Sequence, residues 1–472
     1  MTRQRVVLYN PRAVFFTMPL ALLAVGSHLD PARYEVIVID GRLEKDPVSA
    51  VLAATAGALC LGVTVLTGRP ILDALRVSRL VKQQRPALPV VWGGWHPSMF
   101  AGACASEPPV DVAVEAQGEE TFAEIVDRLA DGSTLEGCEG CTFRNGDGAV
   151  VHNRPRPFAP VERFRPHDYG LIGVDRYYAL KGRRQLDYIS SQGCHFRCAF
   201  CADPSVYRRQ WAGLPPDRVG RELATLWDRY RFADVNFQDE TFFTRAERVE
   251  AIARAIGSRR IPITWAATMR ADQGARLPEE VLALCRRSGL RRALVGVESG
   301  SPETLRRIRK DITLEQVFVT AEKLRRHGIA GQFPFIVGFP GEPPESVQAS
   351  LDVALQLRRM SPDFRTPFFY YRPYPGAVLT EDAVREGYAM PDSLDAWADF
   401  DFVGSAPSPW LTEEQYQRVE RFKFYQTLAY DRAPLWRRPM QRAARWRCTR
   451  HDYRWPVEMQ ISRFVRPPEA LS

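Results

Sequence analysis

The feature that most constrains the fold of this chain is the alternation of apolar, strand-like runs with amphipathic helices along its first 390 residues. In the N-terminal third, strands are predicted at 6–9, 34–40, 59–66, 88–92 and 110–115, and helices at 19–29, 71–85 and 120–129. Strands that are apolar throughout and joined by helices are typical of a parallel sheet covered on both faces. The sequence therefore predicts a doubly wound, Rossmann-like α/β domain that binds ligands at the carboxyl ends of its strands.

A second strand–helix series begins at residue 185. Its strands are predicted at 186–190, 234–238, 263–269, 293–297, 333–337 and 367–371, and its helices at 218–230, 246–256, 278–288, 313–327 and 345–359. Six βα units fit a partial (β/α)6 barrel, with the active face at the carboxyl ends of the strands. We expect a Rossmann-like domain at 1–131, a linker at 132–184, the partial barrel at 185–390 and a mainly helical C-terminal extension at 391–472.

Three cysteines follow the first strand of this second series. Cys194, Cys198 and Cys201 have the spacing C-x3-C-x2-C and can converge on one metal centre from a single loop. Thiolates suit zinc or an iron–sulfur cluster. A closed zinc site needs a fourth ligand, and none follows at finger-like spacing. Three thiolates on a [4Fe-4S] cluster leave one iron open for substrate or cofactor. The spacing favours such a cluster, with structural zinc as the alternative.

With Phe200 as its aromatic residue, the loop matches C-x3-C-x-Φ-C and resembles the signature of the radical S-adenosylmethionine (SAM) superfamily. The resemblance implies a [4Fe-4S] cluster that binds SAM, reductive cleavage of SAM to a 5′-deoxyadenosyl radical, and an electron donor of flavodoxin or ferredoxin type. It also implies that residues at the strand ends receive the SAM ammonium group, ribose and adenine. The candidates are Phe200, Gln238, Asp239, Glu240, Arg270, Glu298, Ser299, Val337 and Gly338.

The N-terminal domain resembles the cobalamin-binding domain found in front of many radical SAM enzymes. Thr64-Val65-Leu66 is similar to the S-x-L element of that family, and 26 residues separate Leu66 from the glycine pair Gly93-Gly94. A small hydroxyl residue and glycines allow the backbone to approach a nucleotide tail closely. The resemblance implies cobalamin bound by Thr64, Leu66, Thr67, Gly93 and Gly94. The family's D-x-H-x-x-G element is missing, so we expect cobalamin without a lower axial histidine.

Together these features predict a cobalamin-dependent radical SAM enzyme that methylates an unactivated carbon. One alternative is a non-methylating oxidative cyclase or ring-rearranging enzyme resembling the anaerobic magnesium-protoporphyrin ester cyclase. Another is a non-catalytic cobalamin or redox sensor. We expect Trp95, Phe242, Tyr371 and Tyr374 to line a pocket for a large, partly apolar substrate, the alternative being that these aromatic residues are core.

From the cysteine usage and the N-terminal residues we expect a cytoplasmic protein. Nine cysteines in 472 residues are too sparse for a disulfide scaffold, and the N-terminus has no apolar run of signal-peptide length. Residues 47–68 carry no charge and could span a bilayer by length. Their glycines and threonines, and a break near Gly57, instead predict a buried helix followed by a buried strand.

Two further segments remain outside the predicted sites. Cys138 and Cys141 form a single C-x2-C before a hairpin signal at Asn145-Gly146, and we interpret them as structural. Residues 432–466 contain ten arginines and no lysine, interleaved with Trp436, Trp446, Trp455 and Phe464. This tail fits peripheral contact with anionic lipid, contact with nucleic acid, or a helical cap with solvated arginines. The net charge of +8 is mild, and we do not expect nucleic acid as a partner.

Overall fold

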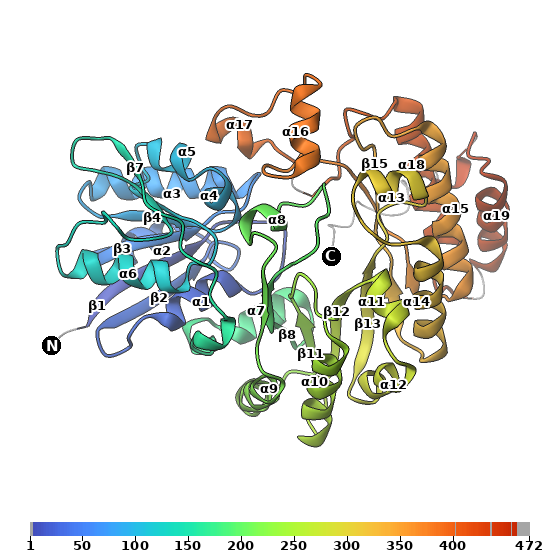
Figure 1. Cartoon of the computed structure of the whole chain (residues 1–472), viewed down its shortest axis with the longest axis horizontal. Coiled ribbons are helices and arrows are strands. Elements are labelled where there is room, and N and C mark those ends of the chain that lie inside the picture. Colours follow the sequence, from blue (N-terminus) through green and yellow to red (C-terminus); the bar gives the residue numbers. More distant parts are fainter. Residues whose placement is uncertain (1–2, 402, 435–436, 455, 460–472) are drawn as a thin grey trace. The chain divides into compact units, whose positions relative to one another are not determined.

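The computed structural model describes residues 3–401, 403–434, 437–454 and 456–459, which form two compact units (Figure 1). The first unit contains residues 3–240, 258–263 and 374–401. The second contains residues 241–257, 264–373 and 403–459. The first unit therefore holds both the N-terminal sheet and the cysteine loop.

The first unit is built on a seven-stranded sheet with the order β2-β1-β3-β4-β5-β6-β7. Its first five strands are parallel, and the hairpin β6–β7 extends the sheet in antiparallel fashion. The order 2-1-3-4-5 has its topological switch point between β1 and β3, where sheets of this kind bind ligands. The predicted doubly wound domain is confirmed. The strands are β1 Gln4–Asn10, β2 Tyr34–Asp40, β3 Ala58–Thr64, β4 Val90–Gly93, β5 Val112–Val114, β6 Cys141–Arg144 and β7 Val150–His152.

Helices cover both faces of this sheet and bury its apolar strands. On one face α1 (Leu20–His28) and α6 (Glu119–Ala130) pack against the strands. On the other face α2 (Pro47–Ala54) and α3 (Pro70–Gln84) do so, together with α17 (Leu394–Ala398). The uncharged stretch at 47–68 is thus a helix and a strand, as predicted. Among the described residues, no helix is both long and apolar enough to cross a bilayer.

The rest of the first unit carries the cysteine loop and its supports. Strands β8 and β11 pair in parallel, and β9 and β10 form a short antiparallel hairpin around the loop. These elements are α4 Trp95–Met99, α5 Ala101–Ser106, η1 Val161–Arg163, η2 Tyr169–Leu171, α7 Val174–Lys181, β8 Gln185–Tyr188, β9 Ser191–Gly193, α8 Asp203–Val206, β10 Trp211–Gly213, α9 Pro216–Tyr230, β11 Asp234–Phe237 and α16 Val378–Arg385.

The second unit continues the strand–helix series, with strands in the order β16-β14-β13-β12. A separate pair, β15 and β17, is also parallel. The strands are β12 Thr264–Arg270, β13 Leu290–Gly296, β14 Ala330–Gln332, β15 Phe335–Val337, β16 Phe364–Arg365 and β17 Phe368–Tyr370. The helices are α10 Ala246–Ser258, α11 Ala271–Arg276, α12 Glu279–Arg287, α13 Pro302–Arg307, α14 Leu314–Arg326 and α15 Pro344–Met360.

The last two predicted strands, 333–337 and 367–371, correspond to β15 and β17, and each follows a short strand that was not predicted, β14 or β16. The breaks lie at Pro334, between β14 and β15, and at Thr366 and Pro367, between β16 and β17. Proline has no N–H to give to a strand ladder, so the pairing is interrupted there. It resumes when the Phe335 N–H donates to the Pro367 carbonyl at 2.9 Å.

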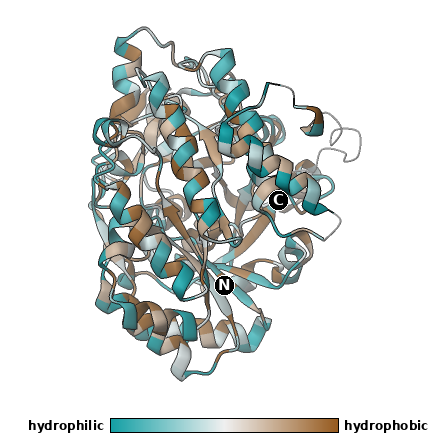
Figure 2. Ribbon diagram, turned by 90° about the vertical axis from the view of Figure 1, so that its right-hand side faces the viewer, coloured by the Kyte–Doolittle hydropathy of each residue, from teal (hydrophilic) through white to brown (hydrophobic). Residues whose placement is uncertain are grey.

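The C-terminal part of the second unit is a pair of packed helices, α18 (Glu413–Tyr430) and α19 (Arg438–Arg450). Helix α18 was predicted at 413–429. Trp436, Trp455 and Phe464 of the basic tail lie outside the described residues. In Figure 2 the strands carry mostly hydrophobic residues, whereas the helices carry hydrophilic residues along much of their length.

Candidate active site

The three motif cysteines lie on one loop that begins directly after β9. All three are half-buried and none is in a disulfide, and the Cys201 N–H donates to the Cys198 carbonyl at 3.2 Å. Gly193 starts the loop with φ +82°, and a Cβ there would lie 2.3 Å from the Gln210 carbonyl oxygen. Only glycine fits this position without a shift of backbone. The glycine therefore sets the path of the chain into the loop.

The electrostatics of the loop favour a positively charged occupant. Burial raises the pKa of Cys201 well above its usual range, and the negative charges of Asp203, Cys198 and Cys194 raise it further. Burial also raises the pKa of Asp203 to about 6. Iron ions bind thiolates and would remove this penalty. Among the described residues, no three His, Cys, Asp or Glu side chains are arranged around a single ion. A [4Fe-4S] cluster does not need such a single-ion site, because each of the three thiolates would bind a different iron.

The three polar residues after β11 are Gln238, Asp239 and Glu240. The first two make hydrogen bonds within the protein, whereas one oxygen of Glu240 makes none. Gln238 donates from Nε2 to Asp187 Oδ1 at 3.0 Å. Asp239 accepts hydrogen bonds from the backbone of Ser190 and from the hydroxyls of Ser190 and Ser191. Glu240, in contrast, has a buried Oε2 with no hydrogen-bond partner. Burial, and then the charge of Asp203, raise the pKa of Glu240 well above its usual range. An unpartnered buried carboxylate oxygen fits a cationic ligand group.

The candidate residues of the second unit are engaged in internal contacts. Arg270 pairs with Asp272 at 2.9 Å, and Glu298 pairs with Lys310 at 2.7 Å. Glu298 has φ +68°, a conformation that costs energy in a residue other than glycine. Ser299 accepts from the Ser301 N–H at 3.1 Å.

The remaining candidates of this unit are packed in the same way. Val337 is fully buried. Gly338, at φ +81°, gives its N–H to Glu342 at 2.6 Å and accepts from the Ser408 hydroxyl at 2.7 Å. Phe200, on the cysteine loop of the first unit, is half-buried.

A cavity of about 300 Å³ lies within the first unit at the carboxyl ends of its strands, in the size range of ligand sites. It opens at the switch point between β1 and β3, where Asn10 and Thr64 line it. Leu66, Gly93 and Gly94 of the predicted cobalamin set also line it, as does α1. Thr67 does not; it is buried, with its hydroxyl 3.2 Å from His96 Nδ1.

The two glycines in the cavity wall differ in what an added Cβ would meet. Gly94 has φ +99°, and a Cβ there would lie 3.0 Å from Thr64 Oγ1 and 3.1 Å from the backbone of Val65. At Gly93 the nearest atom to an added Cβ is Val114 Cβ at 3.6 Å, an ordinary contact. The apolar walls, the glycines and the position at the switch point fit the nucleotide tail of a cobalamin.

His28 and His96 are close in sequence to residues that line this cavity, but neither lines it. His96 is fully buried beside Phe100 and Trp397, and burial lowers its pKa to about 4. His28 ends α1 and packs edge-on against Phe164. Among the described residues, no histidine belongs to the cavity wall, as expected from the missing D-x-H-x-x-G element.

The structure adds cavity residues that the sequence patterns did not single out. Gln117 and Glu119 lie after β5, Gln192 lies two positions before Cys194, and Tyr207 follows the loop. Gln117 and Glu119 could have been found, because they follow a strand at the ligand-binding edge. Gln192 and Tyr207 carry no local signal.

Three of the four aromatic residues expected around the substrate have other environments. Phe242 is fully buried against Phe243 and Trp265. Tyr371 is buried against Phe339 and Trp410. These two are core residues, which was the alternative. Tyr374 packs on Phe400, and Trp95 lines the cavity.

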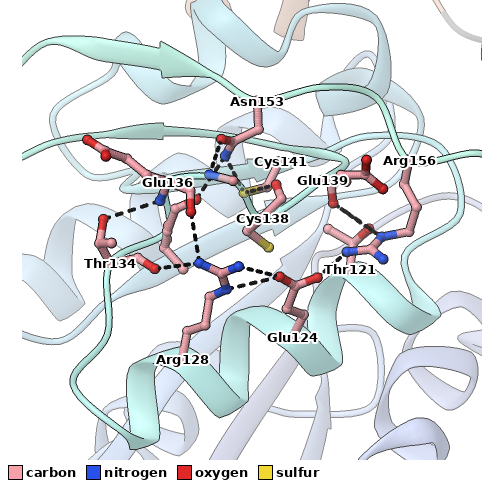
Figure 3. Close-up of polar contacts among 12 residues, drawn as sticks. Thr121, Glu124, Arg128, Thr134, Glu136, Cys138, Glu139, Cys141, Asn153 and Arg156 are labelled. Carbon is pink, nitrogen blue, oxygen red and sulfur yellow. Dashed lines mark hydrogen bonds and ion pairs between the residues drawn. The ribbon is translucent and has the colours of Figure 1, made fainter.

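The second C-x2-C is a buried structural pair (Figure 3). Cys138 and Cys141 are fully buried free thiols. Their mutual hydrogen bond raises the pKa of Cys138 and lowers that of Cys141. Asn153 Nδ2 also donates to the Cys141 sulfur at 3.4 Å. Figure 3 shows Arg128 beside the pair, donating to the carbonyls of Thr134 and Glu136. The burial and contacts of this pair fit the structural interpretation.

Comparison with known proteins agrees with both halves of the site. The family described as radical SAM superfamily matches residues 188–354, and the B12 binding domain matches residues 8–126. An uncharacterized methyltransferase of Pyrococcus horikoshii is 30% identical over 87% of this chain and 88% of its own length. The chain belongs to the radical SAM enzymes that carry a B12 binding domain. Its cofactors are accordingly a [4Fe-4S] cluster, SAM and cobalamin.

Other relatives of these radical SAM enzymes show the range of the fold. The anaerobic magnesium-protoporphyrin IX monomethyl ester cyclase of Synechocystis is 26% identical over 68% of this chain and 64% of its own length. The solved structure of the radical SAM methyltransferase TsrM from Kitasatospora setae, with cobalamin and a [4Fe-4S] cluster bound, has a TM-score of 0.72 at 18% identity. It covers 92% of this chain and 91% of its own, which shows the shared fold.

Proposed function

We propose that this radical SAM enzyme is a cobalamin-dependent methyltransferase acting on an unactivated carbon of a large, partly apolar substrate. The observation that carries the proposal is the composition of the cavity wall. Strand ends of the B12 binding domain, at Thr64 and Gly93, share one cavity with Gln192 and Tyr207, which flank the cysteine loop. Cobalamin and cluster would then lie close enough to act on one substrate. The methyltransferase relative supports the reaction class, and the relative that acts on a tetrapyrrole supports the substrate class.

The residues take separate roles in this proposal. Cys194, Cys198 and Cys201 would hold the cluster, and the unpartnered Oε2 of Glu240 would accept the SAM ammonium group. Gln238 and Asp239 would position Glu240, and Phe200 would shape the loop. The cobalamin tail would enter the cavity past Thr64, Leu66, Gly93 and Gly94, with Thr67 acting through His96. Arg270, Glu298, Ser299, Val337 and Gly338 would shape the adenosine part of the SAM site. When bound, the cluster and SAM would supply hydrogen abstraction, and cobalamin would supply methyl transfer.

A cyclase using the same cofactors without methyl transfer is the second candidate, supported by the Synechocystis relative. Methyl-labelled SAM separates the two functions when the reconstituted enzyme is given candidate tetrapyrrole, polyketide and isoprenoid substrates. Label in the product supports methyl transfer. A product formed without label would overturn it in favour of the cyclase.

Cobalamin binding can be tested without knowing the substrate. Leucine at Gly93 should fill the cavity, since an added Cβ meets only Val114 at 3.6 Å and the fold tolerates it. We expect the Kd for hydroxocobalamin to rise about tenfold or more, which corresponds to ~1.4 kcal/mol. Gly257→Leu, with nothing within 4 Å of an added Cβ, is the matched control. Failure of the folded wild-type protein to bind cobalamin would contradict the proposal.

Partner and location complete the proposal. We expect a low-potential donor of flavodoxin or ferredoxin type in the cytoplasm, where the free thiols persist. Helix α19 exposes Met440 and Trp446 among arginines 438, 442 and 450, which fits peripheral contact with anionic lipid. Co-sedimentation with anionic but not neutral vesicles tests this.

The four segments predicted from the sequence, 1–131, 132–184, 185–390 and 391–472, stay our proposed domain division.

A further inference from the structure

The wall of the cobalamin cavity includes both flanks of the cysteine loop, although the cavity belongs to the sheet of the B12 binding domain. Gln192 lies two residues before Cys194, and Val206 and Tyr207 lie five and six residues after Cys201. The ends of the loop that would hold the proposed cluster are therefore surfaces that a cobalamin in this cavity would contact. A change in the loop changes the cavity, and a cavity occupant restrains the loop.

On the first flank, Gln192 ties the loop to the B12 binding domain through a chain of side-chain amides. Gln192 Nε2 donates to Glu119 Oε1 at 2.7 Å, and its Oε1 accepts from Gln117 Nε2 at 2.8 Å. Gln117 is fixed in turn by the backbone of Ala159, at 2.7 Å and 3.1 Å. All three side chains line the cavity. The position of β9, and so the start of the cysteine loop, is set by residues that face the cobalamin site.

On the second flank, Tyr207 joins the cavity to the proposed SAM site. Its ring meets Trp95 edge to face, with 6.0 Å between ring centroids and an interplanar angle of 89°. Burial, and then the negative charge of Glu240, raise the pKa of Tyr207 well above its usual range, so the Tyr207 hydroxyl lies near Glu240, the residue with the unpartnered buried oxygen. Trp95 and Tyr207 both line the cavity. The ring of Tyr207 thus lines the cavity, and its hydroxyl lies near Glu240, the carboxylate proposed to accept the SAM ammonium group.

We propose that Gln192 and Tyr207 are positioning residues that couple cobalamin binding to the assembly of the cluster loop. The inference rests on the proposed function, because it assumes cobalamin in the cavity and a cluster on the loop. A cluster fixes the loop and completes the cavity wall, so cobalamin binds more tightly to the cluster-loaded protein. By linkage, bound cobalamin stabilises the cluster by the same factor.

The experiment compares the Kd for hydroxocobalamin of the full-length chain in cluster-loaded and cluster-free form. The cluster-free form is wild-type protein stripped with a chelator, and the Cys194→Ala/Cys198→Ala/Cys201→Ala variant is the second preparation in case one does not stay folded. We expect the loaded form to bind about fivefold to a hundredfold more tightly. The reciprocal readout is the rate of iron loss to a chelator, which should fall when cobalamin is present.

Two variants assign the coupling to the named residues. Gln192→Leu removes both amide hydrogen bonds, and Tyr207→Phe removes only the contact with Glu240. We expect the ratio of the two Kd values to fall to near one in Gln192→Leu and to be intermediate in Tyr207→Phe. Gln348→Leu is the matched control, because Gln348 is also half-buried and bonds Asp352 and His451 outside the cavity. A purely structural role would weaken binding in both forms and leave the ratio unchanged.

The outcomes separate this inference from the proposed function. Equal affinity of the two wild-type forms would overturn the coupling while cobalamin binding itself stands. A wild-type ratio that survives in both variants would overturn the assignment to Gln192 and Tyr207. No binding in either form would remove the cobalamin site, and with it the function on which the coupling rests.

Discussion

Two groups of cysteines in the same unit share the C-x2-C spacing and differ in everything around it. Cys138 and Cys141 are fully buried and hydrogen-bonded to each other, and the Cys141 sulfur also accepts from Asn153. Cys198 and Cys201, with Cys194, are half-buried on a loop, near carboxyl groups whose pKa values burial raises. A buried thiol that is already hydrogen-bonded inside the core is poorly placed to ligate a metal. Cys201, in contrast, is subject to burial and to the charges of Asp203 and the other two loop cysteines, which raise its pKa and favour a positively charged partner.

The sharpest test of this contrast is loss of iron. Alanine at Cys194, Cys198 and Cys201 should bring iron and the broad visible absorption of the reconstituted protein to background, since a cluster needs its thiolate ligands. Alanine at both Cys138 and Cys141 is the matched control and should leave iron at the wild-type level. Iron close to wild type in the triple variant, measured by a colorimetric assay, would contradict the cluster assignment.

The second test concerns the carboxylate beside the loop. Glu240→Gln keeps the shape of the side chain and removes its charge, so we expect the Kd for SAM to rise about tenfold to a hundredfold, the value of one charge-assisted hydrogen bond. Equilibrium dialysis of the cluster-loaded protein measures this, with iron content as the check that the loop is intact. Glu458→Gln is the matched control and should leave the Kd unchanged, because Glu458 is also half-buried but accepts from Tyr425 and Arg447 near the end of the chain. Unchanged SAM affinity in Glu240→Gln would remove this residue from the SAM site.

The same contrast shows what the sequence could and could not predict. The cysteine loop and the glycine pair were predictable because each depends on spacing within a short stretch and on its position at a strand end. The roles within the triplet 238–240 were not, since they depend on partners far along the chain, such as Ser190 for Asp239. Gln192 and Tyr207 were missed for the same reason.

Packing decided the cases where the sequence pattern was ambiguous. Phe242 and Tyr371 follow strand ends as pocket residues would, but side chains of that size are also the usual filling of a core, and here they are core. The break between β14 and β15 is different, because Pro334 was visible in the sequence as a residue that cannot donate to a ladder. That break could have been predicted.

The third test measures what the buried pair contributes. Cys138→Ala or Cys141→Ala should lower the free energy of unfolding by about 1–2 kcal/mol, because each change leaves a small cavity and removes a hydrogen-bond partner. Thermal unfolding of the cluster-free protein measures the loss. Cys198→Ala, on the half-exposed loop, should cost less in the same assay. An equal loss at Cys198 would mean that the two groups do not differ structurally.

The smallest expected effect concerns access to the buried pair. Arg128 bonds the Thr134 and Glu136 carbonyls and pairs with Glu124 at 2.7 Å (Figure 3), which holds the segment before Cys138 against α6. Arg128→Ala should let this segment open more often, and we expect alkylation of Cys138 and Cys141 in the folded protein to be about fivefold faster, equivalent to ~1 kcal/mol. Mass spectrometry of the modified peptide follows the rate. Arg163→Ala, which removes a more exposed ion pair with Glu120 on the same helix, should leave the rate unchanged. An unchanged rate in Arg128→Ala would show that the reagent reaches the two thiols only when the whole protein unfolds. Local opening of the segment before Cys138 would then play no part.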